Sequence, residues 1–310
     1  MLHLVPRFIK EPFYALARRL VNCRLSSFPL TLPQAEAWAD TIKKYPVIFG
    51  SESFPRLCTL LHGIQMRLGV TDHIERHLRI EKQWDRPVSA VLEAVLKPGA
   101  TFLDIGANIG YFSLLASRMV QDSGRVISIE PSHRALRKFT ENMHRNRCGN
   151  VTLLSVGAGD SFQNLRLTLA NEGNIGGSSI MADPGRQPTE SIAVIPLAAL
   201  LGPLQVRPDL IKMDIEGFEL FALKGLFSEV DWQCPVVCEV TAEFLQRNGQ
   251  SVRELLSFMQ SHGYQAHRLI ETSGTIYCKR LQVNTDYEAS PQFDAIFVHS
   301  TQQSPLPAED

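Results

Sequence analysis

Short apolar runs alternate with amphipathic segments along the chain from Val88 onward. Runs such as TFLDIG and RVISIE have the length and β-branched content of strands, and the segments between them carry apolar residues at helical spacing. This alternation is typical of βαβ units, which build a parallel sheet. We predict strands at 101–106, 125–130, 151–158, 209–217, 235–240, 263–269 and 294–300, and helices at 88–96, 111–120, 133–146, 218–226 and 251–263.

The region before this alternation has a different pattern. It carries helical periodicity but is interrupted by prolines such as Pro29, Pro33 and Pro46. We therefore predict a mostly helical N-terminal extension over residues 1–85 and an α/β domain over residues 86–300. Residues 301–310 are polar and proline-containing, and we predict a disordered tail there.

The first residues form an apolar and basic segment. Its longest apolar run, FYALA, is far shorter than a membrane span or a signal-peptide core, so we predict no transmembrane segment. Ile9, Phe13, Leu16 and Leu20 follow helical spacing. Such a stripe packs on its own domain, on a second copy in a homo-oligomer, or on a membrane surface, and the first two are the commoner arrangements.

Composition narrows the class of partner. The chain has 310 residues, with 31 basic and 32 acidic side chains, so it lacks the basic surface of a nucleic-acid binder. We therefore predict no nucleic-acid partner. The six cysteines contain no CxxC pair and no zinc-ligand spacing, which indicates free thiols in a reducing, cytoplasmic compartment.

The stretch TFLDIGANIG identifies a ligand site at the end of the first strand. A dinucleotide loop would carry glycine where Asn108 stands, and no P-loop motif occurs. Asp104, Gly106 and Gly110 instead fit a loop that carries no phosphate, with backbone open to the amino-acid portion of S-adenosylmethionine (SAM) and an acid for its ammonium group. Tight strand–helix packing would also require the two glycines, and both explanations hold together.

Two further acids complete the predicted cofactor site. Glu130 ends the second strand, where a carboxylate can accept both hydroxyl protons of a ribose, although NAD enzymes use the same device. Asp160 follows the third strand in GAGD, where it could meet the adenine amino group.

Three motifs together resemble the FkbM family of SAM-dependent methyltransferases. They are DIGANIGYFS, ISIEP and LIKMDIEGFELFALKG, and the similarity runs from about Met66 to Val298. The resemblance implies a class I, Rossmann-like α/β fold with a seven-stranded sheet whose last hairpin is reversed. It also implies methyl transfer to oxygen on sugars, polyketides or lipid-like metabolites.

By matching motifs, the resemblance assigns cofactor contacts and a second signature. The cofactor contacts are Asp104, Gly106, Asn108, Gly110 and Glu130, and the second signature comprises Asp214, Glu216, Gly217 and Glu219. Many family members carry a Leu-Asp pair before this signature, whereas Leu197 is followed here by Ala198.

The chemistry of methyl transfer to a hydroxyl requires removal of a proton. Asp214 and Glu239 end two central strands, and with Glu216 they are our candidate catalytic acids. They act either as a general base or, for Asp214 and Glu239, as ligands of Mg²⁺, which prefers oxygen. Alternatively, Asp214 and Glu216 cap the following helix. Lys212 is expected to be a salt-bridge partner rather than a catalyst.

Substrate choice is expected to lie in the N-terminal region and in residues 161–201. The stretch NEGNIGGSSI fits either a lid or the turn of a β-hairpin between LRLTLA and SIAVIPL. We predict an O-methyltransferase that acts on a small molecule or glycan. The alternative is a SAM-binding scaffold or partner subunit without turnover.

Overall fold

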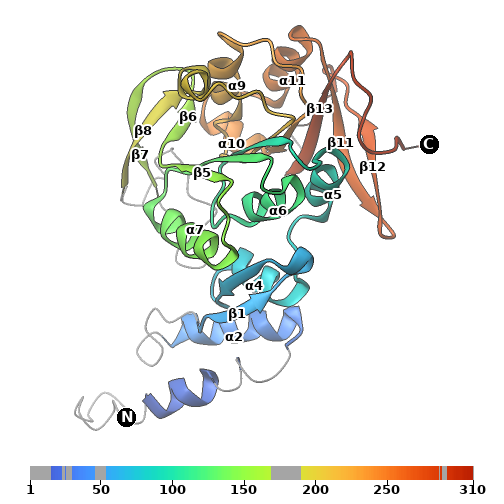
Figure 1. The fold of residues 1–310 in the computed structure, drawn as a ribbon. Coiled ribbons are helices and arrows are strands. Elements are labelled where there is room, and N and C mark those ends of the chain that lie inside the picture. Colours follow the sequence, from blue (N-terminus) through green and yellow to red (C-terminus); the bar gives the residue numbers. More distant parts are fainter. Residues whose placement is uncertain are drawn as a thin grey trace. The chain divides into compact units, whose positions relative to one another are not determined.

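The computed structural model describes residues 15–22, 25, 30–45, 54–168, 190–285, 287 and 292–309 (Figure 1). The described residues form two compact units, which divide between Trp84 and Asp85. Among the described residues, no helix is long and apolar enough to cross a bilayer.

The first unit is mainly helical but also contains a small antiparallel sheet that the sequence analysis missed. A helix covers residues 15–22, and the other elements are α2 (Leu32–Lys44), β1 (Arg56–Thr59), the 3₁₀ turn η2 (Leu61–Gly63), β2 (Gln65–Leu68) and α4 (His73–Glu81). The guanidinium of Arg79 is buried and donates to the carbonyls of Leu25 and Phe54. This side chain therefore ties α4 to segments far away in the sequence.

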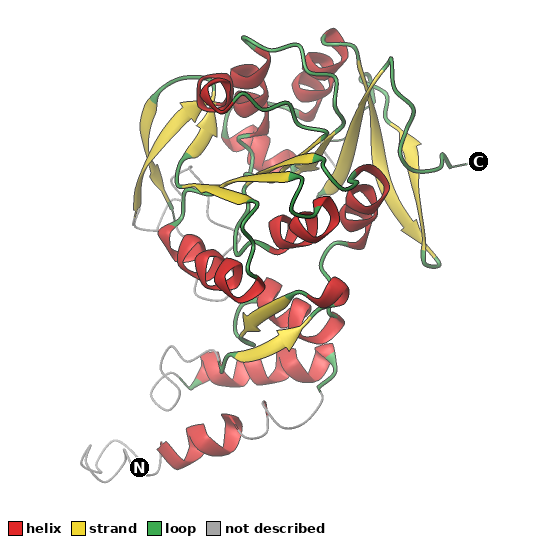
Figure 2. Ribbon diagram, viewed as in Figure 1, coloured by secondary structure: helices red, strands yellow, loops and turns green. Residues whose placement is uncertain are grey.

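The second unit is built on an eight-stranded sheet with helices on both faces (Figure 2). In spatial order the strands are β12 (Thr275–Arg280), β11 (Tyr264–Thr272), β13 (Phe293–His299), β10 (Val236–Val240), β9 (Leu210–Met213), β3 (Thr101–Ile105), β4 (Arg125–Ile129) and β5 (Val151–Leu154). The helices are α5 (Arg86–Val95), α6 (Tyr111–Val120), α7 (His133–Asn146), α8 (Leu197–Leu201), the 3₁₀ turn η4 (Gly202–Leu204), α9 (Glu219–Phe227), α10 (Ala242–Arg247) and α11 (Val252–Ser261).

The order of the strands reverses between β3 and β9. The chain runs outward from β3 through β4 to β5 and then returns to β9 and β10, all in parallel. Right-handed crossovers that run in opposite directions place their helices on opposite faces of the sheet. The carboxyl ends of strands at such a switch point are where α/β folds bind ligands.

The reversed last hairpin is confirmed, and the sheet has one strand more than predicted. β13 is antiparallel to both β10 and β11, as the family resemblance implies. The additional strand, β12, pairs antiparallel with β11 at the edge of the sheet.

The described residues 301–309 of the C-terminal tail, where we predicted disorder, contact the edge strand β12. The N–H of Cys278 on β12 donates to the carbonyl of Pro307 at 2.8 Å, and the N–H of Glu309 donates back to Cys278 at 3.0 Å. Lys279 and Glu309 add an ion pair at 3.0 Å. The polar composition suggested disorder, but backbone hydrogen bonds to an edge strand do not depend on apolar side chains.

The predicted third strand splits into two. Its first half is β5, and its second half is β6 (Gly157–Gly159), which joins a separate three-stranded sheet with β7 (Gln163–Leu167) and β8 (Glu190–Pro196). β7 and β8 pair antiparallel, as the hairpin interpretation requires. The stretch NEGNIGGSSI, and with it the predicted lid or turn, lies outside the described residues.

Candidate active site

The loop between β3 and α6 has a backbone that only certain residues adopt. Gly106, Asn108 and Gly110 have φ values of +78°, +50° and +90°. A side chain at Gly106 would overlap the carbonyl of Asp214, and one at Gly110 would overlap the ring of Phe139. Contacts within the chain therefore require both glycines, as the packing explanation predicted. Their cofactor role remains a prediction.

Asp104 lies beneath this loop and is fully buried. Its Oδ2 accepts a hydrogen bond from the Ser113 hydroxyl at 2.5 Å, and its Oδ1 lies 3.8 Å from the Lys212 ammonium. Burial raises the pKa of Asp104, and Lys212 and Ser113 act against that shift. The carboxylate thus contacts α6 and β9 in this structure, and its predicted contact with the SAM ammonium remains a prediction.

Glu130 connects the glycine loop to the start of α7. Its Oε2 accepts from the Asn108 N–H and its Oε1 from the Ser132 N–H, both at 2.8 Å. Burial raises its pKa to about 7, although both hydrogen bonds lower it. Each carboxylate oxygen has a second lone pair, so both can still accept from a ribose.

The two residues that donate to this carboxylate each carry an unpartnered polar side-chain atom. Asn108 Oδ1 and Ser132 Oγ are buried and have no hydrogen-bond partner among the described residues. Buried polar atoms without partners are costly, and a hydroxyl-bearing ligand would satisfy them. The residues around Glu130 therefore fit the ribose of SAM. Asn108 was a predicted contact, whereas nothing in the sequence singled out Ser132.

Asp160 does not lie where the sequence analysis placed it. The third strand of the main sheet ends at Leu154, and Asp160 follows β6 in the smaller sheet. Its Cα is 3.0 Å from the Cβ that Gly225 would carry, near the C-terminal end of α9. The premise that Asp160 ends the third strand is wrong, because the apolar run continues past the point where the chain leaves the sheet.

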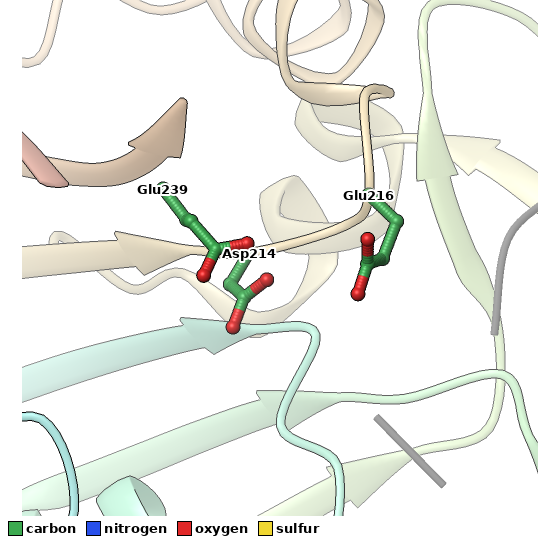
Figure 3. Close-up of side chains that lie close together, drawn as sticks. All are labelled: Asp214, Glu216 and Glu239. Atoms are coloured by element: carbon green, nitrogen blue, oxygen red, sulfur yellow. The ribbon is translucent and has the colours of Figure 1, made fainter. Parts of the chain in front are cut away.

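Asp214, Glu216 and Glu239 come together at the carboxyl ends of β9 and β10 (Figure 3). One carboxylate oxygen from each lies within 4.8 Å of those of the other two. We call these three residues the carboxylate triad. Three oxygen ligands at this spacing fit a divalent cation such as Mg²⁺.

The turn that carries Glu216 is held by Glu219. Glu219 Oε1 accepts from the N–H groups of Ile215 at 3.0 Å and Gly217 at 3.2 Å. The N-cap of α9, Phe218, makes no side-chain capping bond. Glu219 therefore binds the backbone of the turn that precedes α9, and within the described part of the chain neither Asp214 nor Glu216 accepts a hydrogen bond from the first turn of this helix.

Burial, followed by repulsion between neighbouring acids, raises the pKa values of two triad carboxyls. Burial first, then Asp214, Glu216 and Asp294, raise the pKa of Glu239 to about 10. Burial and the neighbouring acids Asp214 and Glu219 raise the pKa of Glu216 to about 8. Glu216 and Glu239 therefore ionise less readily than exposed glutamates do.

Asp294 and Asp85 join the same edge and were missed by the sequence analysis. Asp294 stands opposite Glu239 in the β10–β13 register. Because β13 is reversed, its first residues lie at the edge of the sheet where the parallel strands end. The reversed direction of this strand could therefore have placed Asp294 near Glu239. Asp85 caps α5 by accepting from Val88, and its charge raises the pKa of Asp294 further after burial has raised it.

Lys212 is the cation that these acids share. Its Nζ lies 3.3 Å from Asp214 Oδ2, 3.3 Å from the Gly106 carbonyl oxygen and 5.3 Å from the centre of the Phe112 ring. Burial alone would lower its pKa, but Asp214 and Asp104 raise it above the usual value. The salt-bridge interpretation of Lys212 is confirmed.

The parallel sheet with its reversed strand β13 and the glycine loop at the switch point define a class I SAM-dependent methyltransferase. The sequence matches the methyltransferase FkbM domain over residues 104–266, more than half of the chain. The chain belongs to the FkbM methyltransferase family.

Individual relatives are distant. The AMB antimetabolite synthetase AmbE of Pseudomonas aeruginosa is 26% identical over 198 residues, which cover 52% of this chain and 9% of that protein. The 23S rRNA (uracil(1939)-C(5))-methyltransferase RlmD of Psychrobacter arcticus is 28% identical over 122 residues, 38% of this chain and 23% of that protein. A solved methyltransferase FkbM from Methylobacillus flagellatus is 20% identical, covering 70% of this chain and 56% of that one, with a TM-score of 0.42.

Proposed function

We propose that this chain transfers the methyl group of SAM to a hydroxyl oxygen on a small molecule, a sugar or a lipid-like metabolite. The observation that supports the proposal is the carboxylate triad, which lies at the switch-point edge where β9 adjoins the strand that carries the glycine loop. A hydroxyl acceptor must lose a proton as it is methylated, and carboxylates with raised pKa values are suited to take it.

The cofactor half of this proposal is assigned to the first two strands. Gly106, Asn108 and Gly110 would hold the amino-acid portion of SAM, and Glu130 with Ser132 would hold the ribose. SAM supplies an activated methyl group when it is bound. The remaining task of the protein is to orient the acceptor hydroxyl, exclude water and accept the proton.

The triad can serve this chemistry in two ways. As a base, Glu216 or Glu239 in its ionised form takes the hydroxyl proton. As metal ligands, Asp214 and Glu239, with Glu216 nearby, would hold Mg²⁺, which would supply a Lewis acid that favours loss of the hydroxyl proton. A divalent cation would also favour the ionised forms of these acids, because it offsets their mutual repulsion.

We propose that the acceptor carries no charge around the hydroxyl that is methylated, and that it is not a nucleic acid. Several carboxylates at this edge would repel phosphates, and Lys212 is already engaged by Asp214 and Asp104. The structure describes five of the six cysteines, all except Cys23, and each of the five is a free thiol. This supports the proposal that the protein works in a reducing, cytoplasmic compartment.

The deciding experiment measures methyl transfer from labelled SAM to a library of hydroxyl compounds. Asp214→Asn and Glu239→Gln are expected to lower turnover by about 10²–10⁴ while affinity for S-adenosylhomocysteine (SAH) stays within a few-fold. Glu243→Gln, an exposed acid paired with Arg247 on α10, is the matched control and should change neither value.

Chelation separates the two versions of the chemistry. Activity that is lost in EDTA and restored by Mg²⁺ would support metal ligation, and activity that EDTA leaves unchanged would support a general base. Near-normal turnover in both triad variants would remove the triad from the mechanism. SAH binding without transfer to any hydroxyl would favour the scaffold alternative.

A further inference from the structure

A row of buried polar side chains crosses the centre of the main sheet. Asp104 on β3 stands in register with Ser128 on β4 and with Lys212 on β9. Their chain neighbours, such as Leu103 and Ile211, belong to the apolar core on the opposite face. Because side chains alternate along strands, the polar row shares the other face.

Helix α6 covers this row and bonds to it. The Ser113 hydroxyl donates to Asp104 at 2.5 Å and lies 2.7 Å from the Ser128 hydroxyl. Asp104, Ser113 and Ser128 are fully buried, and Lys212 is 5% exposed. A polar network at this depth has few alternative arrangements, since water cannot replace its partners.

The end of the row reaches both halves of the proposed site. Lys212 Nζ donates to the carbonyl of Gly106, which begins the glycine loop, and to the carboxylate of Asp214, which belongs to the triad. The face of the Phe112 ring confines the ammonium on a further side. One buried side chain therefore holds a cofactor-side atom and an acceptor-side atom at 3.3 Å each.

We propose that Lys212 is a positioning residue that fixes the glycine loop and the Asp214 carboxylate relative to one another. The inference rests on the proposed function, in which the loop holds SAM and the triad acts on the acceptor. Methyl transfer depends on the alignment of the two reactants, and a displacement of about 1 Å can cost about 10²-fold in rate. The competing explanation is that Lys212 only neutralises the buried charge of Asp104.

The test removes the positioning contacts without leaving an unpaired buried acid. Lys212→Met alone would leave the buried Asp104 carboxylate without its counter-charge and is expected to destabilise the fold. We therefore combine it with Asp104→Asn in a double variant, in which neither of these two buried side chains is charged. The double variant should recover the thermal midpoint. We expect its SAH affinity, measured by calorimetry, to be about ten-fold weaker and its turnover about 10²-fold lower than those of the Asp104→Asn single variant, which loses the predicted Asp104 contact with the cofactor but keeps Lys212.

Two matched variants sharpen the result. Lys224→Met, at an exposed lysine on α9, makes the same side-chain change away from the site and should leave SAH affinity and turnover unchanged. Lys212→Arg keeps a cation and N–H donors, and we expect it to retain at least about ten-fold more turnover than the double variant.

The outcomes separate this inference from the proposed function. If the double variant folds and matches the SAH affinity and turnover of Asp104→Asn, Lys212 is only a counter-ion and the positioning role is overturned. If the wild-type protein methylates no hydroxyl but binds SAH, the proposed function fails, and a loss of SAH affinity in the double variant beyond that in Asp104→Asn still supports the contact with the loop. Failure of the wild type to bind SAH would overturn both.

Discussion

The missing side chain at Gly106 is required by the carbonyl of Asp214, a backbone atom that cannot rotate away. Gly249 also has a positive φ, +70°, but has open space where its side chain would lie. Both positions have a positive φ and they differ in steric contact, so a comparison of the same substitution at each isolates the effect of the contact.

Gly106→Ala is expected to cost about 3 kcal/mol or more of folding free energy, because the added methyl group overlaps backbone. Gly249→Ala should cost only about 1 kcal/mol, from the positive φ alone. Denaturant unfolding of both variants checks the difference. Equal losses would show that the loop moves away from Asp214 at little cost. Gly106 substitutions are therefore a poor test of SAM binding by themselves.

Glu130 offers a cleaner test of the cofactor site, because its carboxylate can be neutralised without a change of size. Glu130→Gln exchanges one acceptor oxygen for a donor beside Asn108 or Ser132, and we expect SAH affinity to fall by about ten- to a hundred-fold. Calorimetry checks this value. An unchanged affinity would remove the end of β4 from the ribose site.

The same variant should change how stability depends on pH. Burial raises the pKa of Glu130 from 4.5 to about 7, so the folded protein binds a proton more tightly than the unfolded chain does. This contribution to stability is complete below pH 4.5 and is lost as the pH rises through about 7. Unfolding free energies of the ligand-free protein should fall across this interval less steeply in Glu130→Gln than in the wild type.

At the level of elements, the parallel strands were predictable because they are buried on both faces and form continuous apolar runs. The same property hid the break after Leu154, since the run VTLLSVGA stays apolar while the chain passes from one sheet to another. The short strand β12 was missed because its alternation is weak and polar turns surround it.

The candidate site was predictable only in part for a related reason. Strand ends located Asp104, Glu130, Asp214 and Glu239, because parallel strands place their carboxyl ends at one edge. The contribution of Asp294 depends on the direction of β13. Local spacing does not reveal that direction, which was predicted only through the family resemblance and was not used to locate Asp294.

The C-terminal residues give the edge strand β12 a partner along part of its length. Truncation after Thr301 would leave the N–H and carbonyl of Cys278 without partners and should lower the thermal midpoint by roughly 3–6 °C. It should also promote association through the exposed edge. Glu309→Gln removes only the exposed ion pair with Lys279 and should shift the midpoint by less than about 2 °C. Calorimetry and light scattering measure both effects, and a monomeric truncation with an unchanged midpoint would contradict them.

On the scale of the whole molecule, basic and acidic side chains are nearly equal in number but are unevenly distributed. The chain carries 31 basic and 32 acidic side chains, yet one edge of the main sheet gathers acids from four separate parts of the sequence. They are Asp85, Asp214, Glu216, Glu239 and Asp294. Net charge therefore says little about which acceptors this edge admits.

The contact between Gly106 and Asp214 has a consequence for how such enzymes can be recombined. The glycine loop and the end of β9 are more than a hundred residues apart in sequence, yet a backbone atom of one fills the space that a side chain of the other would need. Neither segment is an independent module. A chimera that takes the loop from another methyltransferase without the matching end of β9 would bring together two backbone segments that do not fit sterically. Loop grafting in this family therefore has to exchange both segments as a pair.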